Sequence, residues 1–346
     1  MTTLKTVCYK GRLCGYKELG WRSRVNGSGL PGPPKGDPVH LASEQHVPRA
    51  LPELMVVGGG KGGVGKTCFS VNLAVEIARR GWRVVLVDAD LSCSNVEAML
   101  GVSAAARLDD YFDPVAPRAL TDILCPTGYE NLRLIAGTTG LSDAAHPRFQ
   151  QKVALMKELK GLEADLVILD LDAGAHYNTL DFFLLGESQS FLVITPERTS
   201  IDNAFKFLRA ALFRRIERFY ESPEAALLLK RHETIHDFLT ALEKADCLPE
   251  ATRETLFHEV VHLARGLKPK VVVNKAASPY EARIAFNIFS KYARQLLHIE
   301  PDSFGHLIYD NCMSEAINAG VPLVAGRPRH PIAASISDMT NRLGYF

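Results

Sequence analysis

The segment that most constrains this chain is Gly60-Lys61-Gly62-Gly63-Val64-Gly65-Lys66-Thr67. It fits the pattern G-x-x-x-x-G-K-[ST] at every required position, between an apolar strand candidate and an amphipathic helix. Glycines let successive backbone N–H groups point inward around phosphate oxygens, and the positive end of the following helix strengthens the attraction. The segment therefore predicts a phosphate-binding loop, in which Lys66 reaches the β- and γ-phosphates and the Thr67 hydroxyl ligates Mg²⁺.

Short apolar runs alternate with helical segments after Pro52. Most of these runs are nearly continuous in Val, Ile and Leu, which is typical of strands that are covered on both faces. We therefore expect an α/β fold: a three-layer, mostly parallel sheet flanked by helices, the first of which is stopped by Gly81. The strand candidates are Leu54–Val57, Arg83–Val87, Asn131–Ile135, Asp165–Leu169, Phe191–Thr195, Lys270–Val273 and Gly305–Tyr309.

The domain organisation has three parts. Residues 1–50 are rich in Gly and Pro and hold eight Lys/Arg against three Asp/Glu, a net charge of about +5 (eight minus three). We expect a flexible basic leader there, or alternatively an interaction arm, followed by one P-loop domain over 51–346. The alternation lapses at about 221–266, which predicts a helical insertion with helices at Ala225–Ala245 and Ala251–Arg265.

Composition narrows the class of protein. The chain has 346 residues, 47% of them hydrophobic, and a net charge of +1, which argues against disorder and does not indicate nucleic-acid binding. No run approaches the ~18 apolar residues of a membrane-spanning helix, and the N-terminus lacks the apolar region of a secretory signal. Seven scattered cysteines form no disulfide framework, so we expect a cytoplasmic protein.

A second lysine, Lys61, gives the loop the deviant form GKGGVGKT. With this loop the chain resembles the MinD/ParA-like ATPases, a family that includes flagellar-number regulators of the FlhG/FleN type. The resemblance covers about 55–220 and 267–343 and extends to six further motifs. These are Val84–Asp90, Leu166–Gly174, Phe191–Glu197 with Ser200–Ala204, Val273–Lys275, Tyr309-Asp310 and Ala316–Pro322.

The resemblance implies roles for residues outside the loop. Asp170 at a strand end suits Mg²⁺ on chemical grounds, with Asp88 assisting, while Asp90 would orient the attacking water. Lys61 would cross to the phosphates of a dimer partner. A simple strand-end cap is the alternative for each aspartate. The expected catalytic set is Lys61, Lys66 and Asp90; the metal set is Thr67, Asp88 and Asp170; the nucleotide-binding set is Gly60, Lys61, Gly62, Gly63, Val64, Gly65, Lys66, Thr67, Cys68, Asn274 and Asp310.

The base preference is also readable. A guanine site would need a carboxylate after Asn274-Lys275, but Ala276 and Ala277 follow. The sequence therefore predicts ATP rather than GTP as the nucleotide, with Asn274 and Asp310 near the adenine. Cys68 departs from the Thr or Ser that the family usually has after Thr67.

The family's mode of action gives the functional expectation. Mg-ATP would close a nucleotide-sandwich homodimer that binds a protein partner, and slow, partner-stimulated ATP hydrolysis would reset it. The process would be spatial positioning, partitioning, or flagellar or division regulation. A nucleotide-binding regulatory scaffold with negligible turnover is the alternative. We expect no direct membrane binding, because the C-terminal residues carry no basic amphipathic helix.

The insertion carries two H-E-x-x-H stretches, at 232–236 and 258–262. Histidines four apart on a helix share a face and could bind zinc, so a metal-binding helical module is a remote alternative function. We interpret both stretches as structural, since His232 would lie in an apolar stripe with Ile235, Leu239 and Leu242.

The predicted helix Ser200–Tyr220 carries apolar residues on more than one face, interleaved with arginines. It either belongs to the core, with its arginines in solvent, or presents a dimer or partner surface.

Overall fold

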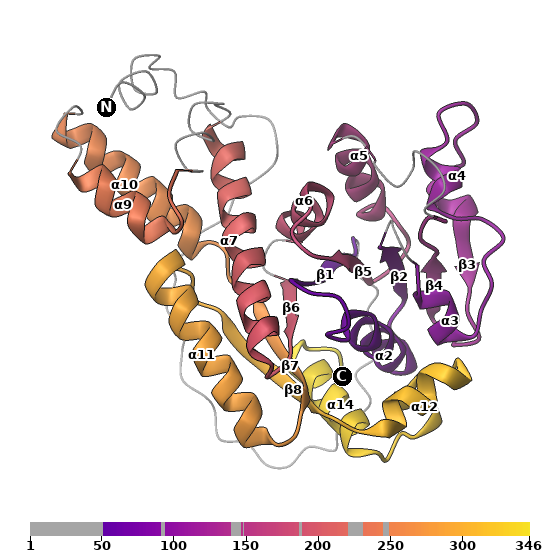
Figure 1. The fold of residues 1–346 in the computed structure, drawn as a ribbon. Coiled ribbons are helices and arrows are strands. Elements are labelled where there is room, and N and C mark those ends of the chain that lie inside the picture. The colour runs from indigo at the N-terminus through magenta and orange to yellow at the C-terminus, as the bar shows by residue number, and fades with distance from the viewer. Residues whose placement is uncertain are drawn as a thin grey trace, which may run out of the picture.

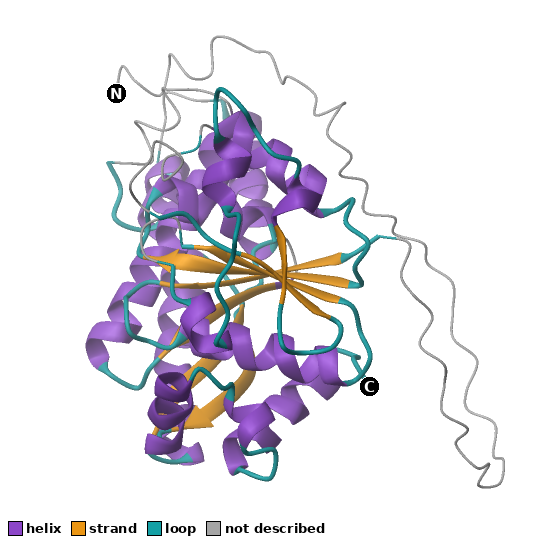
Figure 2. Cartoon of the chain, turned by 90° about the vertical axis from the view of Figure 1, so that its right-hand side faces the viewer, coloured by secondary structure: helices purple, strands orange, loops and turns teal. Residues whose placement is uncertain are grey.

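The computed structural model describes residues 51–90, 94–139, 147, 149–186, 189–220, 231–244 and 249–346, so the predicted leader lies outside the described residues. The described part is built on one eight-stranded sheet with the order β3-β4-β2-β5-β1-β6-β7-β8, and helices cover both of its faces (Figures 1 and 2). The strands are β1 (Glu53–Gly59), β2 (Val84–Ala89), β3 (Leu124–Pro126), β4 (Leu132–Ile135), β5 (Leu166–Ala173), β6 (Ser190–Ile194), β7 (Lys270–Ala276) and β8 (Asp302–Ile308).

The strand pairing confirms the predicted fold class. All neighbouring strands are parallel except β3 and β4, which pair antiparallel at one edge. All seven predicted strands are present. Strand β8 begins at Asp302 rather than at the predicted Gly305. Its first two residues are polar and exposed, so no apolar run marks them in the sequence. Strand β3 was not predicted, because its three residues are too few to show a period and end on a proline, which only an edge strand tolerates.

Two apolar cores lie on opposite faces of the sheet. One contains α2 (Lys66–Arg79), α3 (Val96–Leu100), α13 (Leu323–Gly326) and α14 (Pro331–Arg342), and α12 (Asn311–Ala319) packs on α3 and α13. The helices of the other core are α4 (Leu108–Phe112), η1 (Leu120–Ile123), α5 (Phe149–Leu159), α6 (Tyr177–Leu185), α7 (Arg198–Tyr220), α9 (Ile235–Glu243), α10 (Glu250–Arg265) and α11 (Pro279–Leu297). Strands β1 and β5 lie between both cores, which explains their unbroken apolar sequence.

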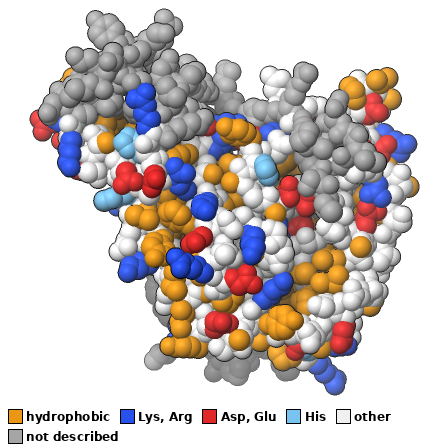
Figure 3. Space-filling view, viewed as in Figure 1, with side chains coloured by type: hydrophobic (Ala, Val, Ile, Leu, Met, Phe, Trp, Pro, Cys, Tyr) orange, Lys and Arg blue, Asp and Glu red, His pale blue; other side chains and the backbone are white. Residues whose placement is uncertain are grey.

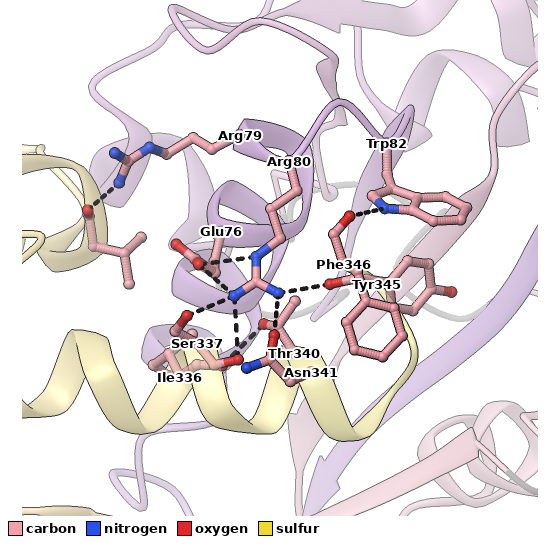
Figure 4. A network of polar contacts seen from close by, with 11 residues as sticks. Glu76, Arg79, Arg80, Trp82, Ile336, Ser337, Thr340, Asn341, Tyr345 and Phe346 are labelled. Atoms are coloured by element: carbon pink, nitrogen blue, oxygen red, sulfur yellow. Dashed lines mark hydrogen bonds and ion pairs between the residues drawn. The ribbon is translucent and has the colours of Figure 1, made fainter. Parts of the chain in front are cut away.

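The C-terminal residues hold the far end of α2 in place (Figure 4). Arg80 donates to Glu76 on its own helix, to Asn341 Oδ1 at 2.6 Å and to the carbonyl of Tyr345 at 2.6 Å. The Tyr345 ring is fully buried, and its hydroxyl donates to Glu53 Oε2 at the start of β1. The helix that begins at the phosphate-binding loop is therefore fixed at both ends.

The insertion is helical where it is described, but its first helix is shorter than predicted. Helix α9 begins at Ile235, with Thr234 as its N-cap, and part of the predicted Ala225–Ala245 helix lies outside the described residues. The prediction that His232 lies on the helical stripe is therefore wrong. Its ring instead packs edge-on against Phe238, with 5.7 Å between centroids.

One face of helix α7 belongs to the core, but the expectation that its arginines lie in solvent is wrong for Arg214 and Arg218, which are 24% and 22% exposed and pair with the buried Asp181. Phe207, Leu208 and Leu212 are buried against the sheet and the neighbouring helices α6, α10 and α11. Among the described residues, no helix is both long enough and apolar enough to span a membrane.

Candidate nucleotide-binding site

The loop from Gly60 to Gly65 connects β1 to the N-terminus of α2, as the sequence predicted. Gly60 leaves no room for a side chain, because a Cβ there would lie 2.1 Å from the carbonyl oxygen of Asn203 on α7. Gly65 has φ +92°, a left-handed conformation that favours glycine. The loop thus curls tightly against α7, and the first amides of α2 open toward the site.

The end of β7 holds the loop from outside. Asn274, a buried residue, donates from Nδ2 to the carbonyl of Val64 at 2.8 Å, and Lys275 donates from Nζ to the carbonyl of Gly63 at 2.8 Å. Lys275 adopts φ 57°, in the left-handed region that residues other than glycine rarely adopt. Asn274 therefore supports the loop directly, and its place near the adenine stays a prediction.

Asp170 lies at the centre of the site and is buried. Its Oδ1 accepts from Ser70 Oγ at 2.7 Å, and the Thr67 hydroxyl also hydrogen bonds to it. Burial, and then repulsion from Asp88, raises the pKa of Asp170 to about 7, although the two hydroxyls and Lys66 act in the opposite direction. A buried carboxylate beside a hydroxyl supplies oxygen ligands of the kind that Mg²⁺ prefers, and Lys66 adds a cation for the phosphates.

Asp88 pairs with Asp170 in the register of β2 and β5. Its Oδ2 accepts from Ser94 Oγ at 2.6 Å and from the backbone amides of Asn95 and Val96 at 3.1 Å each. These bonds place Asp88 against the start of α3, and its assistance at Mg²⁺ stays a prediction. Burial raises the pKa of Asp88 to about 6.

Asp90 and Lys61 lie at the rim of the site. Asp90 follows β2, is partly exposed, and donates its backbone N–H to Asp88 Oδ1. Lys61 extends from the loop to the N-terminal end of α7, where its Nζ is 3.4 Å from Glu197 Oε2 and 3.2 Å from Thr199 Oγ1. In the single chain, the distinctive lysine is therefore held within its own molecule.

The remaining predicted residues are Cys68 on α2 and Asp310 just after β8. Burial, and then the charge of Asp170, raises the pKa of the Cys68 thiol to about 11, so this cysteine stays protonated at neutral pH. Asp310 is the N-cap of α12 and accepts from the amide of Cys312 at 2.8 Å. The ends of β7 and β8 meet through a bond from Tyr309 N to the carbonyl of Ala276, which puts Asn274 and Asp310 on the same edge of the sheet.

The H-E-x-x-H stretches do not form one site. His258 and His262 share an exposed face of α10, but Glu259 accepts from Tyr220 Oη at 2.8 Å and so contacts α7. In the described ranges, Asp310, Cys312 and His330 are the one group of three metal-ligand residues close to one another. His330 Nδ1 accepts from the amide of Ile332, which leaves the proton on Nε2, so we assign no metal to that group.

Sequence reasoning missed three supporting residues. Ser70 bonds Asp170, Lys275 bonds the loop, and Thr199 bonds Lys61. Ser70 could have been found, because it lies one helical turn after Thr67 and so faces the same strand.

The sequence profile of the CobQ/CobB/MinD/ParA nucleotide binding domain (CbiA) matches residues 55–323. The antiactivator FleN of Pseudomonas aeruginosa is 32% identical over 158 residues, which are 45% of this chain and 55% of FleN. The septum site-determining protein MinD of Bacillus subtilis is 30% identical over 158 residues, which are 45% of this chain and 58% of that protein. The match thus spans about half the length of these curated relatives.

Among solved structures, MinD of Pyrococcus horikoshii, complexed with Mg-ADP, has a TM-score of 0.58 to this chain. The comparison covers 84% of this chain and 96% of that protein at 19% identity. This likeness shows the same fold.

Proposed function

Because the chain belongs to the CobQ/CobB/MinD/ParA nucleotide-binding family, we propose that it is an ATPase switch. Mg-ATP drives a homodimer that binds a protein partner, and slow hydrolysis returns the chain to the monomer. The observation that carries this proposal is the buried Asp170 beside Thr67 and Lys66, at the mouth of a phosphate-binding loop. Asp170 and Thr67 supply two metal ligands, and Lys66 supplies a cation, at one place.

The residues of this chain have separate roles in the proposed reaction. The loop amides and Lys66 bind the phosphates, and Thr67 and Asp170 would hold Mg²⁺. The chemistry that Mg²⁺ supplies when bound is charge neutralisation on the β- and γ-phosphates. Asp88 orders the segment that carries Asp90, whose carboxylate would orient the attacking water.

In the proposed resting state, before a second chain binds, Lys61 contacts Glu197 and Thr199. Both side chains of the ion pair are largely exposed, at 42% and 67%, so the pair is weak and easily exchanged. When a second chain brings its own triphosphate close, Lys61 leaves Glu197 for the stronger anion across the interface.

The biological process is proposed from the relatives. FleN is called an antiactivator and MinD a septum site-determining protein, so we place this chain among regulators of positioning or division in the cell. Its partner would be a protein that recognises the ATP-bound dimer and stimulates hydrolysis.

Phosphate release from the purified protein with Mg-ATP tests the proposal. Asp90→Ala should retain ATP, because no phosphate or metal contact is removed, and should slow phosphate release by roughly 10²-fold or more. Asp122→Ala, at an exposed aspartate of η1 outside the proposed site, is the matched control and should hydrolyse ATP normally. An Asp90→Ala protein with normal turnover contradicts the role of Asp90. Wild-type protein that binds ATP and releases no phosphate, alone or with partners, supports the scaffold alternative.

A further inference from the structure

Helix α11 presents a row of large apolar side chains to solvent. Tyr280, Ile284, Ile288 and Tyr292 follow one another at intervals of four residues and are 70%, 41%, 42% and 48% exposed. We call these four residues the α11 stripe. Residues four apart lie on one face of a helix, so the stripe runs for about 18 Å. Figure 3 shows hydrophobic side chains along α11, with Lys and Arg beside them.

The stripe is not needed to hold α11 in place. The opposite face of the helix is buried in the core through Ala282, Ala285, Phe289, Ala293 and Leu297. Ser278 caps the N-terminus by accepting from the amide of Glu281. A row of exposed apolar side chains on an already anchored helix is typical of an interaction surface.

A hollow with unsatisfied polar character lies beside the stripe. It has a volume of about 340 Å³ and is lined by Asn287, Ser290, Lys291, Arg294 and Gln295. Ser290 is 2% exposed, and its hydroxyl has no hydrogen-bond partner within the described part of the chain. A buried hydroxyl without a partner is costly, so this hollow suits a polar group supplied from outside.

The charges around the α11 stripe indicate which polar group would fit the hollow. The exposed charged residues of α11 are Arg283, Lys291 and Arg294, and none of its exposed residues is acidic. Arg294 pairs with Glu300, while Arg283 and Lys291 have no ion-pair partner among the residues that the structure describes. The surface therefore favours an anionic side chain next to apolar ones.

We propose that the α11 stripe docks an amphipathic helix of a partner protein, whose apolar residues are flanked by Asp or Glu. One of these carboxylates enters the hollow, where Ser290 Oγ donates to it and Lys291 supplies the opposite charge. A helix laid along the stripe matches both its length and its four-residue spacing. This inference goes beyond the proposed ATPase switch and does not depend on nucleotide.

Other occupants fit the surface less well. A second copy of α11 would bring Arg283, Lys291 and Arg294 against their own equivalents, which is repulsive. The leader is basic by sequence and would meet the same repulsion. A membrane would need apolar side chains that project several ångströms, whereas Ile284 and Ile288 keep more than half of their surface covered.

Two designed helical peptides of about 18 residues provide the probe. Both carry Leu at i, i+4, i+7 and i+11; one has Glu at the flanking positions and the other has Lys. We expect the nucleotide-free protein to bind the Glu peptide about tenfold more tightly at low salt, with a smaller difference at high salt. Fluorescence anisotropy of the labelled peptides measures both affinities.

Three variants locate the binding. The double substitution Ile284→Gln with Ile288→Gln should weaken binding about tenfold, and Lys291→Glu should remove most of the preference for the Glu peptide, because Arg283 then offsets the new carboxylate. Val115→Gln, at an apolar residue that is 90% exposed and outside α11, is the control and should change neither affinity. ATP binding of each variant, measured separately, should equal that of the wild type.

Several outcomes would overturn the inference. These are equal binding of the two peptides, no binding of either, or no effect of the double substitution. Capture of the wild type by vesicles containing phosphatidylserine, lost in the double variant, would assign the stripe to a membrane instead. A dimer mass that falls to a monomer mass in the double variant would assign it to self-association.

Discussion

Lys66 is the residue on which nucleotide binding most depends. It is a buried cation at the first turn of α2, close enough to Asp170 to lower that residue's pKa. We predict that Lys66→Ala abolishes ATP binding, because it removes the full charge that the loop directs at the β- and γ-phosphates. Isothermal titration calorimetry checks this result, and an unchanged affinity would refute the assignment. Lys268→Ala removes an exposed cation away from the loop and serves as the control.

Asp170 should make the protein sensitive to pH. Its pKa rises from 3.8 to about 7 on folding, because of burial and then repulsion from Asp88. A group with a raised pKa stabilises the fold below its unfolded pKa, and this contribution is lost as pH rises through the folded value. We therefore expect the nucleotide-free protein to lose stability between about pH 4 and pH 7.

The same shift should act oppositely on metal binding. Mg²⁺ needs the carboxylate, so its affinity in the presence of ATP should increase as pH rises through about 7. Asp170→Asn should weaken both pH dependences, and the part of the stability loss that remains belongs to Asp88, whose pKa burial also raises. Urea unfolding and Mg²⁺ titration across this range measure them, and a wild-type profile in Asp170→Asn would contradict the account.

For individual residues, the sequence predicted which side chains lie near the loop but not what each one contacts. Lys66 and Thr67 follow from a local pattern, because strand, loop and helix are adjacent in the chain. Asp170 lies on β5, a hundred residues after Ser70, and was predicted from its place at the end of its own apolar strand. The capping bonds of Asp88 depend on how the chain returns through residues 94–96, and no short motif encodes that path. The contacts of Asn274 and Lys61 join segments more than a hundred residues apart.

Among the elements, three helices meet at one buried carboxylate. Asp181 on α6 lies 2.6 Å from Lys152 Nζ on α5, and it also pairs with Arg214 and Arg218 on α7 at 2.9 and 3.1 Å. Burial opposes ionisation, but the hydrogen bonds from Arg214 and Lys152 and the charge of Arg218 bring the pKa of Asp181 below its ordinary value. This group therefore stabilises the face of the sheet that carries α5, α6 and α7.

We predict that Asp181→Asn lowers the free energy of unfolding by about 3–5 kcal/mol, because it leaves three cations together without their anion. Urea denaturation measures the change. Glu315→Gln is the matched control, since it breaks an exposed pair with Arg327 and should cost less than about 1 kcal/mol. Equal effects of the two substitutions would show that the cluster around Asp181 carries no special weight.

Elements with a long, regular pattern were predictable, and irregular ones were not. Strands β1 and β5 are recognisable as unbroken apolar runs, because both of their faces are buried. Helix α2 is recognisable by the helical period of its apolar face. The start of α9 depends instead on the bonds between Thr234 and Asp237, which cap the helix after His232 rather than before it. The three-residue β3 depends on pairing with β4, a contact that its own sequence does not indicate.

For the whole molecule, we propose that ATP brings two chains together through Lys61. The contact of Lys61 with Glu197 and Thr199 shows that its side chain is extended and at the surface, where a second chain can reach it. Lys61→Ala should leave ATP affinity within a few-fold, because Lys66 and the loop amides remain. ATP-dependent dimerisation and hydrolysis should both fall, the latter by about 10²–10³-fold, since two triphosphates would face each other without bridging cations.

The most direct test is the molar mass of the protein in solution with Mg-ATP, measured by light scattering for wild type, Asp90→Ala and Lys61→Ala. We predict a dimer mass for the wild type and a more persistent dimer for Asp90→Ala, whose hydrolysis is blocked. Lys61→Ala should keep a monomer mass while calorimetry shows that it still binds ATP. A Lys61→Ala protein that forms an ATP-induced dimer with normal turnover would contradict the sandwich-dimer mechanism for this chain.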